Sequence, residues 1–413
     1  MSTIVAPGSL VADTELDAIR GIAEAGLPVF LADLERLVNV DCGSYTPTGV
    51  NQIGDWVAAD IASNGGRVER LPDASRRFGD TVVGTFDGRP GAGPRLLLIG
   101  HMDTVFEEGT AAERPFRIED GNAMGPGVSD MKGGLLLGLR AIAALREFGG
   151  SLARLPFESI TFVANPDEEI GSPSSTVHIR RIAEHVDACF VLEAARASGD
   201  FVSQRKGIAD QRIVVHGRAA HAGVEPEKGR NAILAGAELA RGIQALNGRW
   251  PGATANVGVF KAGTRPNIVP DLAELQVDVR ATTAEGLAQI VTAIRELAAA
   301  PAVPDVTVEI STMASWAPME KLERSGRLAD HTIALARRLG FETKDVATGG
   351  ASDANTTSGM GVPSIDGLGP IGGLDHAPGE YVEVGSIVPR LALFAALLLE
   401  VGRDPVVASW RAG

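Results

Sequence analysis

The first part of the chain alternates between amphipathic stretches and short, continuous apolar runs. Apolar residues recur with helical spacing over residues 15–38, 50–66 and 133–150, and glycines end the last two stretches. Pro28 lies inside the first stretch. Because proline lacks a backbone N–H and its ring obstructs the preceding turn, we expect this helix to be divided there.

The apolar runs between these helices are predicted to be strands. They are rich in Leu, Ile, Val and Phe and cover residues 81–86, 95–103, 159–169 and 187–195. A continuous apolar run is typical of a strand that is buried on both faces, as in a parallel sheet covered by helices. We therefore expect an α/β domain built on a mostly parallel, helix-covered sheet.

The pattern changes after residue 206. From there the predicted order is strand, helix, strand, strand, helix, strand, which is the order of a ferredoxin-like α+β unit. We expect this unit to form an inserted domain over residues 207–316. Residues 1–206 and 317–413 then form one discontinuous domain, which closes with an apolar helix at 388–402.

Length and composition agree with a folded protein of two domains. The chain has 413 residues, which exceeds the usual size of a single core, and it is 45% hydrophobic and 22% charged. Its formal net charge is −14. Nucleic acid is therefore not an expected partner, because no basic surplus exists to pair with phosphates.

Cysteine usage and the N-terminus indicate the compartment. Cys42 and Cys189 are the only cysteines, which excludes a disulfide framework and a cysteine-rich zinc site. The first 21 residues contain early acids and no basic region, and no window reaches the ~18 uninterrupted apolar residues of a membrane span. We expect a cytoplasmic protein that does not cross a membrane.

Polar side chains of one kind follow three of the predicted strands. The first of these strands ends in His101 and Asp103, the next ends in Glu168 and Glu169, and the third ends in Glu193. In open α/β sheets, binding sites form beyond the carboxyl ends of the strands. If the strands are parallel, these side chains meet at one edge of the sheet. Each of them alone would be interpreted as a solvated loop residue.

Two further residues extend this candidate site. Asp130 lies among glycines before a predicted helix, where an acid is usually just a cap, and His376 lies in a late loop, where a lone histidine is usually solvated. Carboxylates and imidazoles without thiolates suit Zn²⁺, with Mn²⁺ or Co²⁺ as alternatives. Five such ligands exceed the need of one ion and fit two ions about 3.5–4 Å apart.

Several short motifs follow one another along the chain: HMDTV, GPGVSDMKGG, NPDEEIGS, LEAAR, AAHAG, RPNIVP, GGASDA and DHAPGEYV. They occur in the order seen in M20 metallopeptidases, and the chain resembles the glutamate carboxypeptidase branch of this family over roughly residues 30–402. The resemblance implies a zinc-peptidase-like catalytic domain and an inserted dimerisation or lid domain.

The resemblance also implies which residues bind which metal ion. His101 and Glu193 would hold one ion, and Glu169 and His376 would hold the other. Asp130 would bridge the two ions, and the peptide bond after it is expected to be cis.

Two acids are expected to assist the metal ligands. By resemblance, Asp103 accepts the second imidazole N–H of His101 and so fixes its tautomer. Glu168 is the expected general base, which takes a proton from water and passes it to the leaving nitrogen. On an extended backbone Glu168 and Glu169 cannot point the same way, so one would face the metal and the other the water.

Residues of the inserted domain and of a nearby loop complete the implied site. His221 would reach the active site of a partner subunit and stabilise the oxyanion, which requires a homodimer formed through the inserted domains. Asn267 matches a position that contacts the substrate. Gly349 and Gly350 resemble a loop whose backbone lines the substrate side of the pocket.

One segment departs from the pattern of the branch. Residues 310–320 read ISTMASWAPME and lack the arginine that holds a substrate carboxylate in the relatives. Arg205 and Lys206 offer a cation by another route, and the alternative is that they form a solvated hinge. A carboxylate-bearing small molecule remains the expected substrate.

The expected reaction is hydrolysis of an amide C–N bond that releases a C-terminal glutamate, or a similar amino acid, from an N-acyl or folate-like substrate. The same apparatus would also suit an N-acyl amino acid amidohydrolase or a deaminase of an amino-aromatic carboxylate. A non-catalytic binding protein of this fold is a remote alternative. The presence of Glu168 and of every ligand argues against it.

Overall fold

The computed structural model describes residues 10–410, so the part of the N-terminal prediction that concerns residues 1–9 lies outside it. The chain forms two compact units. The first contains the chain up to residue 203 together with 321–347 and 352 onwards, and the second contains 204–320 and 348–351. The second unit is thus larger than the 207–316 expected from sequence. Its extra residues are tied together by backbone hydrogen bonds, in both directions between Arg205 and Met319 and from Lys206 to Thr348.

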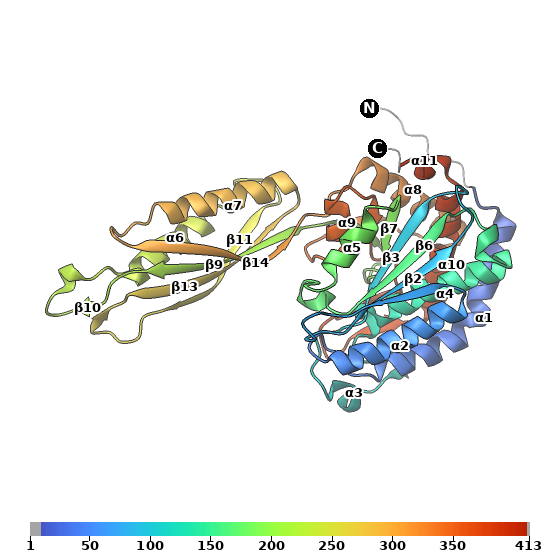
Figure 1. Ribbon diagram of the computed structural model, residues 1–413, viewed down its shortest axis with the longest axis horizontal. Helices are drawn as coiled ribbons and strands as arrows, with labels where there is room; N and C mark the ends of the chain where they lie inside the picture. Colours follow the sequence, from blue (N-terminus) through green and yellow to red (C-terminus); the bar gives the residue numbers. More distant parts are fainter. Residues whose placement is uncertain (1–9, 411–413) are drawn as a thin grey trace. The chain divides into compact units, whose positions relative to one another are not determined.

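The first unit is built on a six-stranded sheet (Figure 1). Four neighbouring strands run parallel, and an antiparallel pair extends one side of the sheet. The predicted mostly parallel sheet is therefore found, with an antiparallel edge. In spatial order the strands are β1 (Arg67–Leu71), β2 (Thr81–Asp87), β6 (Ser159–Asn165), β3 (Arg95–His101), β7 (Ala188–Val191) and β16 (Ser364–Ile365).

Helices cover this sheet and supply most of its core. Three long helices, α1, α4 and α10, pack against one another, and α5 packs against α9 (Figure 1). The helices are α1 (Asp13–Val38), α2 (Pro47–Ser63), α4 (Gly133–Gly149), α5 (Thr176–Ala183), α8 (Glu323–Arg338), α9 (Asp353–Gly359) and α10 (Val384–Arg403), with the short α3 (Thr110–Glu113) and α11 (Pro405–Ala408).

The expected division of the first helix at Pro28 is wrong. α1 continues through the proline, because its buried face extends on both sides, from Ile19 and Ala23 to Phe30 and Leu34. Packing of this face stabilises the helix enough to tolerate the missing backbone hydrogen bond.

Helix α10 has the length and hydropathy of a membrane span, but 78% of its most apolar stretch is buried inside the unit. Arg390 interrupts the apolar run and is itself buried, where it donates hydrogen bonds to the carbonyl oxygens of Gly367 and Gly369. α10 is thus a core helix of the first unit.

A small antiparallel sheet lies within the first unit and supports two of the expected metal ligands. Asp130 follows its strand β5, and His376 lies in the connection between β17 and β18. The strands are β4 (Arg117–Glu119), β5 (Asn122–Met124), β17 (Gly372–Gly373) and β18 (Tyr381–Glu383); β8 (Phe201–Arg205) and β15 (Asp345–Thr348) form a separate pair.

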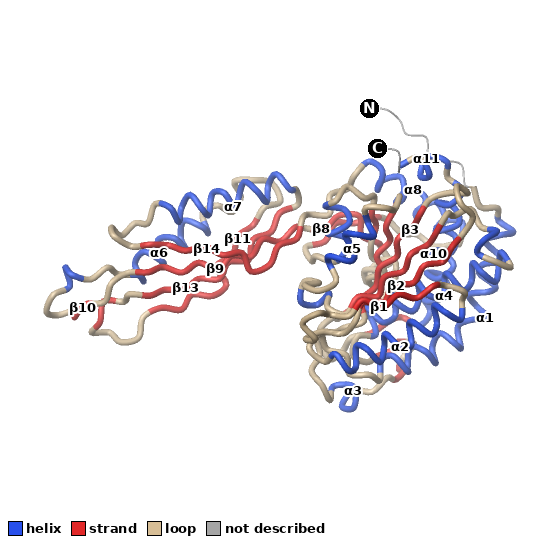
Figure 2. Tube along the Cα trace, in the orientation of Figure 1, coloured by secondary structure: helices blue, strands red, loops and turns tan. Residues whose placement is uncertain are grey.

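The second unit has the predicted ferredoxin-like order (Figure 2). Its four main strands are antiparallel in the spatial order β11, β13, β9, β14. Alternate residues of the inner strands are buried against the two helices, which gives this unit its own core. The elements are β9 (Gly207–His216), β10 (Ala220–His221), α6 (Ala232–Gln244), β11 (Thr254–Ala262), β12 (Ile268–Val269), β13 (Leu272–Ala281), α7 (Ala284–Ala299) and β14 (Thr307–Trp316).

Candidate metal centre

The carboxyl ends of three parallel strands meet at one edge of the first unit's sheet. β3 pairs with β6 on one side and with β7 on the other, and it ends in His101. Glu168 follows the end of β6, and Glu193 follows the end of β7. The sheet therefore brings together residues that are up to 92 positions apart, which is the convergence expected from the strand ends.

Asp130 lies between two histidines. Its Oδ1 is 3.0 Å from Nε2 of His101, and its Oδ2 is 3.0 Å from Nε2 of His376. The peptide bond between Asp130 and Met131 is cis, as expected from the family resemblance. Each oxygen of this carboxylate thus faces a different imidazole, which is the arrangement that a bridging ligand requires.

The remaining acids divide between the two histidines. Oε1 of Glu193 lies 3.7 Å, and Oε2 of Glu168 4.0 Å, from Nε2 of His101. Oε2 of Glu169 lies 3.2 Å from Nε2 of His376. Two sets of three ligand atoms, each within 4.8 Å of one another, can be drawn from this cluster. The sets are His101 with Glu168 and Glu193, and His101 with Asp130 and Glu169, so they differ from the division that the resemblance implies, in which Glu169 shares an ion with His376.

The electrostatics of the cluster fit a bound cation. Burial raises the pKa of Glu168 well above its usual value and also raises that of Glu169. Hydrogen bonds to Asp130 and Glu169 raise the pKa of His376 to about 10. Burial opposes ionisation of Asp130, but its hydrogen bonds with the two histidines outweigh burial and hold the pKa of its carboxyl well below the usual range.

One buried atom also points to a missing partner. Oε1 of Glu169 is buried and has no hydrogen-bond partner among residues 10–410. Buried carboxylate oxygens are normally paired, and a metal ion would satisfy this one. The donor set of carboxylates and imidazoles fits Zn²⁺, Mn²⁺ or Co²⁺.

Asp103 has more partners than the sequence suggested. Nδ1 of His101 is closest to the backbone carbonyl of Asp103, at 3.0 Å, and lies 3.4 Å from the carboxylate. The carboxylate accepts hydrogen bonds from the Ser44 hydroxyl and from the backbone N–H groups of Glu168 and Glu169. Asp103 therefore contacts His101 and also anchors the turn that carries Glu168 and Glu169.

The expected extended backbone at Glu168 and Glu169 is wrong. Residues Glu168–Ile170 form a 3₁₀ turn. Successive side chains on a 3₁₀ helix are about 120° apart, so the two glutamates still diverge, but for a different geometric reason.

Sequence reasoning missed two buried acids next to the cluster. Glu380, four residues after His376, binds the backbone around Asp130. Asp353 accepts hydrogen bonds from Asn165 and Ser172, which flank the glutamate turn. Both acids lie inside motifs on which the family resemblance rests, Glu380 in DHAPGEYV and Asp353 in GGASDA. Their place in these motifs could have marked them as candidates.

The second unit, which includes the loop 348–351, contains the other predicted residues. Asn267 accepts a hydrogen bond with its carbonyl from the N–H of Ala222, so it lies beside the exposed His221. The Gly350 carbonyl accepts a hydrogen bond from Arg205, and the Gly349 carbonyl accepts one from Arg280.

Arg205 is not part of a solvated hinge. It is 4% exposed, and its guanidinium is held by the Gly350 carbonyl. Lys206 is partly exposed. Of this pair, Lys206 is therefore the more exposed residue.

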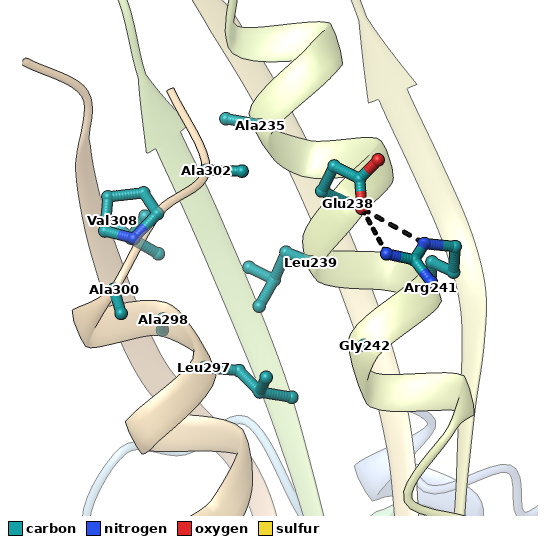
Figure 3. Close-up of a pocket in the computed structure, with 11 residues that line it drawn as sticks. Ala235, Glu238, Leu239, Arg241, Gly242, Leu297, Ala298, Ala300, Ala302 and Val308 are labelled. Atoms are coloured by element: carbon teal, nitrogen blue, oxygen red, sulfur yellow. Dashed lines mark hydrogen bonds and ion pairs between the residues drawn. The ribbon is translucent and has the colours of Figure 1, made fainter. Parts of the chain in front are cut away.

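A pocket of about 220 Å³ lies in the second unit between α6 and the segment that follows α7 (Figure 3). Its wall is mainly small and aliphatic, with an ion pair between Arg241 and Glu238 at its side. None of the predicted site residues lines it.

Comparison with known proteins gives consistent matches over nearly the whole chain. The family model described as peptidase family M20/M25/M40 matches residues 97–400. Carboxypeptidase G2 of Pseudomonas sp. (strain RS-16) is 31% identical over 408 residues, covering 97% of this chain and 96% of that protein. A succinyl-diaminopimelate desuccinylase of Methylobacterium radiotolerans is 28% identical over 384 residues, covering 87% of this chain and 94% of that protein.

Solved structures share the fold. Aminopeptidase PepT from Bacillus cereus ATCC 10987 aligns with a TM-score of 0.77 at 24% identity, covering 91% of this chain and 99% of that one. The aminobenzoyl-glutamate utilization protein from Klebsiella pneumoniae aligns with a TM-score of 0.63 at 19% identity, covering 93% and 97%.

Proposed function

This chain belongs to peptidase family M20/M25/M40 and is a metal-dependent hydrolase, and on that premise we propose that it cleaves an amide C–N bond to release a C-terminal glutamate, or a similar amino acid, from an N-acyl or folate-like substrate. The single observation that carries the hydrolytic proposal is Asp130, whose two oxygens each lie 3.0 Å from a different histidine. The glutamate is proposed from the similarity to carboxypeptidase G2.

We propose that five residues hold two divalent ions, with zinc first. His101 and Glu193 would hold one ion, Glu169 and His376 the other, and Asp130 would bridge them. Such a pair supplies Lewis acidity, which polarises the scissile carbonyl and makes water nucleophilic near neutral pH.

Glu168 is proposed as the general base. It is 8% exposed, so its carboxylate is shielded from bulk solvent, and its Oε2 lies 4.0 Å from Nε2 of His101. Burial raises its pKa, which makes the carboxylate a stronger base than an exposed glutamate. In this role it takes a proton from the attacking water and delivers it to the leaving nitrogen.

His221 is proposed to stabilise the oxyanion from a partner subunit. Its Nδ1 accepts a hydrogen bond from the N–H of Gly223, so the proton of the neutral ring is assigned to Nε2. Oxyanion stabilisation requires an N–H donor of this kind, positioned in a site from which water is excluded.

A homodimer through the second unit is part of this proposal. β11 is an edge strand, and apolar side chains are exposed on it and on α6, which packs against it. They are Ile233, Leu234 and Phe260, each at least 40% exposed. If sedimentation finds only monomer, both the proposed dimer and the proposed role of His221 in a partner's site are refuted.

The segment 310–320 supports a second candidate. It contains no arginine, so a guanidinium clamp for the glutamate carboxylate is absent from it. We propose that Lys206, which is partly exposed, supplies a cation for the substrate carboxylate in its place. The missing arginine favours an alternative function at the same metal centre. This alternative is hydrolysis of another N-acyl amino acid or deamination of an amino-aromatic carboxylate.

The test is a hydrolysis screen of the zinc-loaded protein beside its Glu168→Gln variant. The panel contains pteroyl- and benzoyl-glutamate, N-acyl amino acids without glutamate, and amino-aromatic acids. Glutamate release by the wild type alone supports the first assignment. Turnover of only the other substrates would refute glutamate as the released amino acid but would leave the proposed metal centre intact. Equal rates for the wild type and the variant would refute Glu168 as the general base.

A further inference from the structure

Glu380 is a buried acid that binds backbone beside the metal centre. It is 1% exposed. Its Oε2 accepts a hydrogen bond from the N–H of Gly127 at 2.9 Å, and its Oε1 accepts from the N–H groups of Ser129 at 2.8 Å and Asp130 at 2.9 Å. Both oxygens thus accept hydrogen bonds from backbone donors.

The three donors come from one short turn. Within this turn the N–H of Val128 bonds to the carbonyl of Gly125, and the N–H of Lys132 bonds to the carbonyl of Gly127. The turn begins at Gly127, whose φ of 73° lies in the left-handed region. This backbone path leaves three N–H groups converging on one carboxylate, and a carboxylate is the acceptor that can satisfy them all.

The position of Glu380 in the chain connects this turn to the second histidine. His376 lies four residues earlier, in a short connection closed by the hydrogen bonds from Ala377 to Leu374 and from Glu380 to Ala377. One end of this segment therefore presents an imidazole 3.0 Å from Oδ2 of Asp130. The other end holds the N–H of Asp130 itself.

We propose that Glu380 is a positioning residue that sets the spacing between Asp130 and His376 before any ion binds, so that the two-ion site is preorganised. This inference rests on the proposed function, because it assigns those two residues as ligands. Removing the acceptor would free the turn that carries Asp130. The ion held by His376 and the bridging carboxylate would then bind more weakly.

The experiment measures Zn²⁺ binding to the metal-free full-length protein by competition with a chromophoric chelator. Glu380→Gln keeps the shape of the side chain but replaces one acceptor oxygen with an NH₂ group that faces backbone N–H. We expect its affinity for at least one ion to fall roughly ten- to hundredfold. Glu380→Asp keeps the charge on a shorter side chain and is expected to lie between the glutamine variant and the wild type.

Glu383→Gln is the matched control. It removes a carboxylate three residues further along the chain, at the end of β18, and is expected to bind both ions as the wild type does. The unfolding temperature of each metal-free variant separates positioning from folding. A merely structural role predicts a lower unfolding temperature with wild-type zinc affinity in the folded protein.

Wild-type affinity for both ions in Glu380→Gln would overturn the inference, whereas a wild type that binds no Zn²⁺ would overturn the proposed function instead. Hydrogen exchange on the metal-free wild type provides a test that needs no variant. Slow exchange of the amides of Gly127, Ser129 and Asp130 supports preorganisation. Exchange at the rate of an exposed loop would exclude it.

Discussion

The carboxylate of Asp103 accepts a hydrogen bond of 3.1 Å from the backbone N–H of Glu168. The residue that lies beside the metal-facing histidine therefore also fixes the turn that carries the proposed base. Its other oxygen accepts hydrogen bonds from the N–H of Glu169 and from the hydroxyl of Ser44. The position of Glu168 and the orientation of His101 are thus coupled through the buried side chain of Asp103.

We expect Asp103→Asn to lower kcat roughly ten- to hundredfold, because an amide cannot accept all three hydrogen bonds. The measurement is kcat together with the zinc content of the purified variant. Ser44→Ala removes only the hydroxyl donor and should have a smaller effect. Wild-type kcat in Asp103→Asn at full zinc occupancy would contradict the assigned coupling.

Glu168 and Glu169 form a natural matched pair. Glu168→Gln should lower kcat by roughly 10²–10⁴-fold or more while zinc affinity is retained, because a base is lost and a ligand is not. Glu169→Gln should instead weaken zinc binding. Rates and bound zinc measured on both variants decide the assignment, and the opposite pattern would exchange the two roles.

Metal removal should inactivate and destabilise the protein. The carboxylates of the cluster lose the cation that compensates them, and a ligand that binds only the folded state adds about 2.7 kcal/mol at 100 times its Kd. Chelation should lower the unfolding temperature, and added Zn²⁺ should restore it. In Asp130→Asn the restored shift should be much smaller. An unfolding temperature that is insensitive to Zn²⁺ in the wild type would argue against the site.

A second buried cluster, away from the metal centre, predicts a pH dependence of stability. His331 is 1% exposed and lies 2.9 Å from Asp404 and 3.4 Å from Glu400. Burial opposes protonation of the ring, but the hydrogen bonds to the two acids outweigh burial and raise the pKa of His331. Its stabilising contribution is therefore complete below the ordinary histidine pKa of about 6.5 and is lost as pH rises through the raised value.

We expect His331→Gln to lower the free energy of unfolding by about 3 kcal/mol at pH 6, because Asp404 and Glu400 lose the buried cation between them, although Asp404 keeps its ion pair with Arg327. Urea unfolding from about pH 6 to about pH 9 should show the difference between wild type and variant shrinking with pH. The exposed His185, changed to Gln, is the control and should leave stability unchanged. A difference that grows with pH would refute the assignment.

Local sequence patterns predicted the architecture and the acids and histidine at the strand ends. Continuous apolar runs predicted the buried strands, and the order of elements after residue 206 predicted the second unit's fold. The polar residues at the strand ends predicted the cluster, because parallel neighbours must present their carboxyl ends at the same edge. Residue type and chain position carry this information directly.

Contacts between distant residues were decided only by the tertiary structure. Glu380 and Asp130 are 250 positions apart, and nothing local to either indicates that they touch. The continuity of α1 through Pro28, the 3₁₀ turn at Glu168 and the burial of Arg205 likewise depend on what packs around them. The sequence alone determined which residues are available for chemistry. Packing decided which backbone groups they bind, because a buried polar group takes whichever partner the fold brings within hydrogen-bond distance.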